Sequence, residues 1–150
     1  MKRGSRPRLN RQDSLMIEAR IAIPGETKPR LGMTAESIDL LRSLWRTHGP
    51  LMFHQSGGCC DGSSPMCFAA GEFLTGGSDV LLGVFDVAPA GHPEQLIDFW
   101  MSGEQFAYWS HTYLTVDVVA GRGSGFSLEA PEGVRFLIRS TLMDTAEPFS

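Results

Sequence analysis

The stretch from His54 to Cys67 constrains this chain most, because it gathers all three cysteines in a loop-forming sequence. Glycine, serine and proline surround Cys59, Cys60 and Cys67 and leave little side chain to pack in a core. Glycine also frees the backbone for tight turns and for close approach to a ligand. The stretch therefore predicts a functional loop that carries thiols.

Length and composition fit one globular domain. The chain has 150 residues, of which 42% are hydrophobic and 20% charged, enough for a core of its own. We expect a basic, partly disordered N-terminal extension over residues 1–32, a single domain over 33–143 and a flexible tail over 144–150. No apolar run approaches the roughly 20 residues of a membrane span, and no apolar segment follows the basic N-terminus. These patterns favour a cytoplasmic protein, where three cysteines indicate metal ligation, a reactive thiol or packing, not disulfides.

Charge separates the N-terminus from the rest of the chain. Residues 1–12 contain five basic residues and no acidic one, whereas the whole chain has a formal net charge of −4. The remainder is therefore acidic, which argues against a nucleic-acid-binding face. A short basic run is typical of a disordered terminus.

The hydrophobic pattern predicts an α+β domain, mostly antiparallel β with one main N-terminal helix. We expect Thr34 to cap that helix and Gly49-Pro50 to end it. The apolar strand that follows, residues 51–53, leads into the cysteine loop and places His54 at its mouth. Further strands are expected over 14–23, 67–74, 79–85, 96–101, 112–119 and 134–142, with a hairpin turn at 75–78 and a short helix over 103–110 behind a Ser102/Gln105 capping box.

Thiol and imidazole groups in the loop predict a site for a soft metal. Vicinal Cys59 and Cys60 point to opposite sides of an extended backbone, so one of them joins Cys67 and His54 around an ion more easily than both do. Such donors suit zinc or iron, or an iron–sulfur cluster, better than magnesium or calcium. A further ligand could come from Asp61, His111 or water.

The rival chemistry is a reactive thiol. A cysteine among exposed loop amides can have a lowered pKa, and Cys60 or Cys67 could resolve a sulfenate formed at Cys59. In an enzyme, Cys59 would be the nucleophile and His54 its base. A buried structural thiol is the third possibility.

Four segments carry a family resemblance: HGPLMFHQSGGCCDGSSPMC at 48–67, SDVLLG at 78–83, EQFAYWSHT at 104–112 and GSGFSLEAPEGVRF at 123–136. They resemble a bacterial family catalogued as a domain of unknown function, family number 779. Genes of that family often lie beside aldehyde and alcohol dehydrogenases. The resemblance therefore implies an aldehyde dehydrogenase as a partner, and it implies no mechanism.

A more distant likeness concerns architecture. The order of helix, apolar strand, Gly57-Gly58-Cys59 and the later Gly123–Phe126 segment is similar to the HesB-like A-type iron–sulfur carriers. Cys59 would match their first loop cysteine. Those carriers also use a C-terminal Cys-x-Cys pair, whereas no cysteine follows Cys67 here. The resemblance implies a HesB-like arrangement in which any ligand set comes from the first loop alone.

These patterns together predict an accessory protein. Its cysteine loop would bind a metal ion or iron–sulfur species, or act as a redox thiol, in support of an aldehyde or alcohol dehydrogenase system. One alternative is a thiol-dependent enzyme that acts on an aldehyde or thiol adduct. The other is a non-catalytic, partner-binding subunit with structural cysteines.

Overall fold

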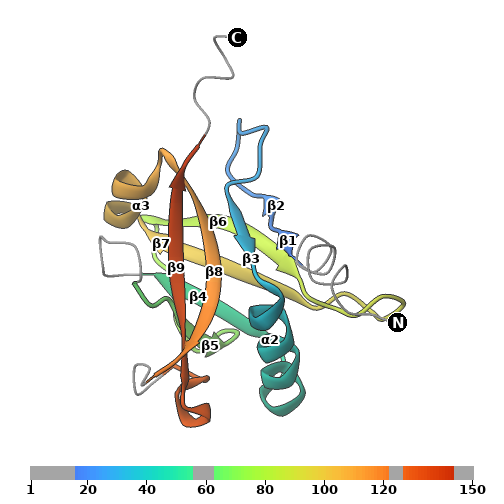
Figure 1. Ribbon diagram of the computed structural model, residues 1–150. Coiled ribbons are helices and arrows are strands. Elements are labelled where there is room, and N and C mark those ends of the chain that lie inside the picture. The colour runs from blue at the N-terminus through green and yellow to red at the C-terminus, as the bar shows by residue number, and fades with distance from the viewer. Residues whose placement is uncertain (1–15, 56–62, 122–126, 144–150) are drawn as a thin grey trace, which may run out of the picture.

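Two β-sheets face each other across one hydrophobic core in the computed structural model, which describes residues 16–55, 63–121 and 127–143 (Figure 1). The long strands of the first sheet cross those of the second at a steep angle. In spatial order, the first sheet contains β1 (Ile17–Glu18), β3 (Leu31–Met33), β8 (Thr112–Ala120) and β9 (Val134–Leu142). The second contains β2 (Arg20–Ile21), β6 (Asp79–Asp86), β7 (Leu96–Ser102), β4 (Leu51–Gln55) and β5 (Met66–Ala69).

Both sheets mix parallel and antiparallel pairs. β3 runs parallel to β8, and β4 runs parallel to β7. The remaining neighbours in the described part of the chain pair antiparallel. β4 is flanked on both sides, by β7 and β5, and all five of its residues are buried.

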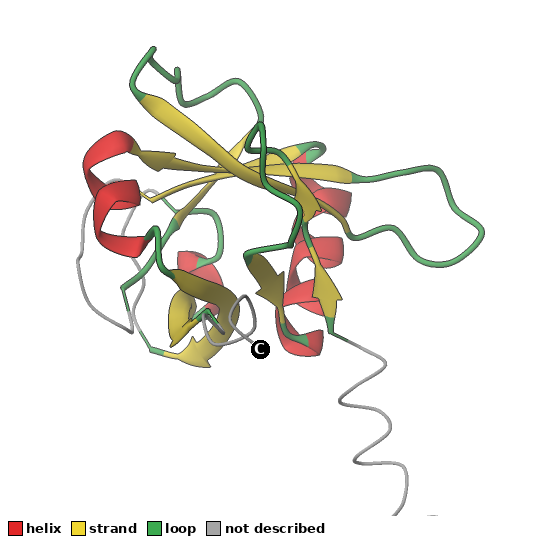
Figure 2. Cartoon of the chain, turned by 90° about the horizontal axis from the view of Figure 1, so that it is seen from above, coloured by secondary structure: helices red, strands yellow, loops and turns green. Residues whose placement is uncertain are grey.

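The two α-helices of the described residues lie on opposite sides of the molecule (Figures 1 and 2). α2 (Ala35–His48) begins at Thr34, whose side chain accepts the Ser37 N–H, and ends at Gly49 with φ 79°. α3 (Gly103–Trp109) begins at Ser102, whose side chain accepts the Gln105 N–H. A short 3₁₀ turn, η1 (Ala130–Glu132), precedes β9. Within the described residues, no helix has the length and apolar character needed to cross a membrane.

Strand alternation builds the core. Phe53 of β4 contacts Phe99 of β7 at 5.4 Å between ring centroids and Phe136 of β9 at 5.0 Å, the latter edge to face. Because Phe53 and Phe136 belong to different sheets, this cluster joins the two layers. Successive residues of a strand point to opposite faces, so the neighbours of Phe53 along β4 face away from the core.

The structure confirms most of the expected elements and corrects one connection. Both caps of the main helix are as predicted, and so is the Ser102 N-cap, whereas the Gln105 side chain accepts from Trp109 Nε1. The predicted hairpin between 67–74 and 79–85 is wrong, because β5 pairs only with β4 and lies at the sheet edge, with β7 and β4 between it and β6. β4 extends through Gln55, and the sheets already include β1 to β3, so the packed body begins before residue 33.

Candidate functional site

His54 is placed by a strand that is otherwise apolar. It lies on β4 opposite Trp100 of β7 and Met66 of β5, and it is only 3% exposed. Its neighbour Phe53 fills the core, so alternation turns the His54 ring to the outer face of the five-stranded sheet. A polar ring this deeply buried needs a specific partner to offset its desolvation.

Asp79 supplies that partner. It is the first residue of β6, where its Oδ2 accepts the Gly76 N–H at 2.7 Å and its Oδ1 lies 3.0 Å from His54 Nε2. The Gly76 N–H and then the hydrogen bond from His54 hold the pKa of Asp79 below its ordinary value. Asp79 is therefore an ionised carboxylate that fixes the His54 ring.

The opposite nitrogen of the ring has no partner among the residues that the structure describes. Because a carboxylate only accepts hydrogen bonds, Nε2 carries the proton of a neutral His54, and Nδ1 carries the lone pair. Nδ1 is buried and has no hydrogen-bond partner within the described part of the protein. Leaving such a group unpaired costs about 1–3 kcal/mol. A carboxylate-held imidazole with one open nitrogen is the arrangement of a general base or of a metal ligand.

Phe73 restricts the ring further. Its centroid lies 4.2 Å from that of His54, and the two planes are inclined by 31°. Phe68 of β5 packs on Phe73 at 5.1 Å. With Asp79 on one edge and Phe73 against its face, the His54 ring has little freedom to rotate.

Cys67 does not share this face. It pairs directly with Phe53, whereas His54 pairs with Met66, so Cys67 points into the core and His54 points out of it. Cys67 has no exposed surface, and burial, with a smaller effect of Glu129, raises the pKa of its thiol. This thiol stays protonated and apart from His54, so the structure does not assemble a ligand set that contains both.

The remaining predicted ligands divide in two. Cys59, Cys60 and Asp61 lie outside the described residues. His111 is exposed in the turn between α3 and β8, directly before β8 of the first sheet. Among the residues that the structure describes, no group of three His, Cys, Asp or Glu side chains is placed to hold a metal ion.

Sequence reasoning missed a buried polar pair beside Cys67. Ser127 Oγ accepts the Cys67 N–H at 2.8 Å and donates to Glu129 Oε1, while Glu129 Oε2 accepts the Phe136 N–H at 3.2 Å. Glu129 is 1% exposed, and burial raises the pKa of its carboxyl despite these hydrogen bonds. The pair ties β5 of one sheet to β9 of the other. Its only sequence signal was the Gly123–Phe136 segment.

Comparison with protein-family models identifies the family of the chain. The family model described as "Domain of unknown function (DUF779)" matches residues 40–142. The chain belongs to this family. The DUF779 match includes His54, Asp79, Cys67 and Glu129, and it begins within α2. No curated protein and no solved structure matches the chain.

Proposed function

We propose that this DUF779 protein is a thiol-dependent protein that captures an aldehyde or thiol adduct, with Cys59 as nucleophile and His54 as its base. The observation that carries the proposal is the His54–Asp79 pair, because its open nitrogen Nδ1 lies on the strand that leads into the cysteine loop. The pair depends on neither Cys67 nor a metal. It therefore supports the hypothesis of a reactive thiol at Cys59 better than the hypothesis of a metal site with three cysteine ligands.

The chemistry needs no oxidant. His54 Nδ1 takes the proton of the Cys59 thiol, and the thiolate sulfur forms a bond to the carbonyl carbon of the aldehyde. The carbonyl π bond breaks, and its oxygen takes the proton back from His54. The product is a hemithioacetal, which releases the aldehyde by the reverse steps. Asp79 stabilises the imidazolium that forms in between, as a carboxylate does for a catalytic histidine.

Capture of this kind suits an accessory role toward an aldehyde or alcohol dehydrogenase, and we include that partner in the proposal. A bound aldehyde is kept from other nucleophiles and can be released to the enzyme that oxidises or reduces it. The order of α2, β4 and the cysteine loop is the support for a HesB-like arrangement within the same proposal.

Alkylation by iodoacetamide, followed site by site with peptide mass spectrometry across pH, tests the thiol. We expect Cys59 to react with an apparent pKa below the ordinary cysteine value of about 8.5. In His54→Gln the rate at pH 7 should fall roughly tenfold or more, because the base is lost. Cys67→Ala is the matched control and should leave the Cys59 rate unchanged. An ordinary Cys59 pKa that His54→Gln does not move would refute the proposal.

Carbon-13 NMR with labelled acetaldehyde tests the adduct. The wild-type protein should give a hemithioacetal signal that disappears on dilution of the aldehyde and is absent from Cys59→Ser. Retention of the signal in Cys59→Ser would assign the capture to another group.

A metal site is the second candidate, and one observation favours it. A histidine that ligates a metal usually donates a hydrogen bond from its other ring N–H to a carboxylate or a carbonyl, as the His54 Nε2–H does to Asp79. With Cys67 facing the core, the ligands would be His54 and the loop cysteines Cys59 and Cys60, with Asp61, His111 or water as a further one. Zinc or iron suits these donors and would supply Lewis-acid or redox chemistry. Metal analysis after anaerobic purification decides: full occupancy in Cys59→Ser, Cys60→Ser and His54→Gln would discard this candidate.

A further inference from the structure

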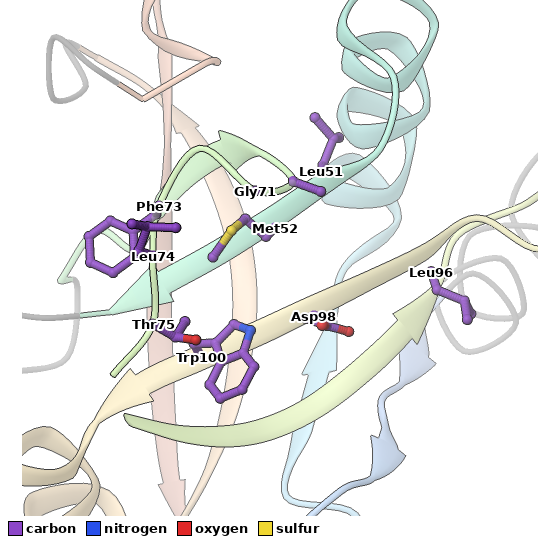
Figure 3. A pocket seen from close by; sticks show the side chains of 10 residues that line it. Leu51, Met52, Gly71, Phe73, Leu74, Thr75, Leu96, Asp98 and Trp100 are labelled. Carbon is purple, nitrogen blue, oxygen red and sulfur yellow. The ribbon is translucent and has the colours of Figure 1, made fainter. Parts of the chain in front are cut away.

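A groove of about 370 Å³ lies on the outer face of the five-stranded sheet, the face to which the His54 ring also turns (Figure 3). β4 and β7 form its floor, and residues 70–75 form one wall. The volume is within the range of sites that take small organic molecules. The residues around it are Leu51, Met52, Ala70, Gly71, Phe73, Leu74, Thr75, Leu96, Asp98 and Trp100.

Most of the residues that line the groove are apolar by type, and some of them are unusually exposed. Leu74 is 86% exposed and Leu96 is 39% exposed, and both border the groove. Met52 and the half-buried Trp100 supply the floor, from neighbouring strands. An apolar ligand body would cover surface that is now in contact with water, which is favourable by about 25 cal/mol per Å².

Among the described residues that line the groove, Asp98 is the one with a charged side chain. It lies opposite Met52 in the register and two residues before Trp100, so both side chains of β7 face the groove. Within the described residues its carboxylate has no hydrogen-bond or ion-pair partner, and no lysine, arginine or histidine lines the groove. A carboxylate in such apolar surroundings favours a cation.

Trp100 strengthens the preference for a cation. The indole lies on the same face of β7 as Asp98, and its ring borders the groove (Figure 3). Indole faces attract organic cations, and Trp is the best of the aromatic side chains for this. In the described part of the chain, the cation–π contact of the protein is Arg30 over Phe106, which leaves the Trp100 ring available.

We propose that this groove binds a small organic ammonium ion with an apolar body. Asp98 is the counter-ion, Trp100 contacts the cationic head, and Met52 with the leucines covers the apolar part. The site goes beyond the proposed thiol chemistry and needs neither Cys59 nor His54. The net charge of −4 of the chain adds a long-range attraction for cations.

Isothermal titration calorimetry with three probes of similar size and different charge tests this. The probes are 2-phenylethylammonium, 2-phenylethanol and 3-phenylpropionate. We expect the ammonium ion to bind most tightly, and we expect Asp98→Asn to weaken it about tenfold while leaving the alcohol unchanged. Asp39→Asn, at an exposed acid on α2, is the matched control and should bind like the wild type.

Two further measurements keep the outcome distinct from folding and from the thiol chemistry. Added salt should weaken ammonium binding to the wild type and have little effect in Asp98→Asn, because the ion pair is screened. Cys59→Ser should bind the ammonium ion normally. Equal affinity for the ammonium ion and the alcohol, or an Asp98→Asn variant as tight as the wild type, would overturn the proposal.

Discussion

At the residue scale, a single step along two paired strands separates His54 from Cys67. Phe53 pairs with Cys67, and His54 pairs with Met66, so the imidazole and the thiol leave opposite faces of the same sheet. The sequence shows both residues near the cysteine loop but not which face each takes. Asp79 was missed as a partner because it is 25 residues away and reaches His54 across β7. Contacts of this kind depend on the strand order, which no local pattern encodes.

Asp79→Asn should destabilise the protein by about 1–2 kcal/mol near neutral pH, because an amide replaces a carboxylate that accepts from both His54 and Gly76. The pKa of Asp79 is lowered in the folded state. Its contribution is therefore fully present above the unfolded value of about 3.9 and is lost as the pH falls through the lower, folded value. Urea unfolding across pH checks this.

The comparison with Asp39→Asn separates this effect from that of removing a negative charge in general. Asp39 is exposed on α2, so its replacement should change stability by less than about 0.5 kcal/mol at every pH. A gap between Asp79→Asn and wild type that persists undiminished at the lowest pH would contradict the assignment to an ionised Asp79.

At the element scale, the outcome depends on how local the signals are. The ends of α2 at Thr34 and Gly49 and the start of α3 at Ser102 could be predicted from the sequence. A helix cap involves residues only three or four positions apart, so its signal is local. A turn closed by the Asp79 N–H and the Gly76 carbonyl lies close to the predicted 75–78 turn, but its glycines could not show that β5 pairs with β4 and not with β6. Pairing partners follow from the burial of whole strands. Here β7 and β4, both largely apolar, occupy the centre of the sheet.

Gly83 of β6 is required by the strand beside it. A Cβ added there would come within 2.7 Å of Ala19 Cβ and 3.2 Å of the Arg20 carbonyl oxygen. Gly83→Ala should therefore push β2 away and cost about 1–3 kcal/mol of stability, measured by thermal unfolding.

Gly77→Ala is the control for that change, since a Cβ at Gly77 meets nothing within 4 Å. It should leave the free energy of unfolding within about 0.5 kcal/mol of wild type. Equal losses in the two variants would mean that the contact with β2 is not what restricts residue 83.

At the scale of the whole molecule, the two sheets are joined through a core cluster and a buried polar pair. Phe53 and Phe136 meet across the layers, and Ser127 with Glu129 ties Cys67 of β5 to Phe136 of β9. The mixed α and β character with mostly strands could be predicted from the sequence. The division into two sheets could not, because it depends on contacts between residues as distant as Cys67 and Ser127.

Glu129→Ala should destabilise the protein by about 2 kcal/mol or more, because the buried Ser127 hydroxyl and Phe136 N–H lose their acceptor. Glu132→Ala, at an exposed position of η1, should have little effect. Denaturant unfolding of the two variants checks this. Similar stabilities for both would show that Glu129 does not hold the sheets together.

The sign of the pH dependence gives a second readout of Glu129. Burial raises the pKa of its carboxyl, so the folded state binds more protons than the unfolded state above the unfolded value of about 4.3. Stability contributed by this group therefore falls as the pH rises through that window. In Glu129→Gln this part of the fall should be absent.

One short segment near the start of the described chain belongs to both sheets at once. β1 pairs with β3, β2 pairs with β6, and Ala19 alone separates them. Separating the two sheets would require breaking either the β1–β3 pairing or the β2–β6 pairing. The sheet that carries the His54 ring and the outer-face groove is therefore linked to the other sheet through residues 17–21 as well as through the core.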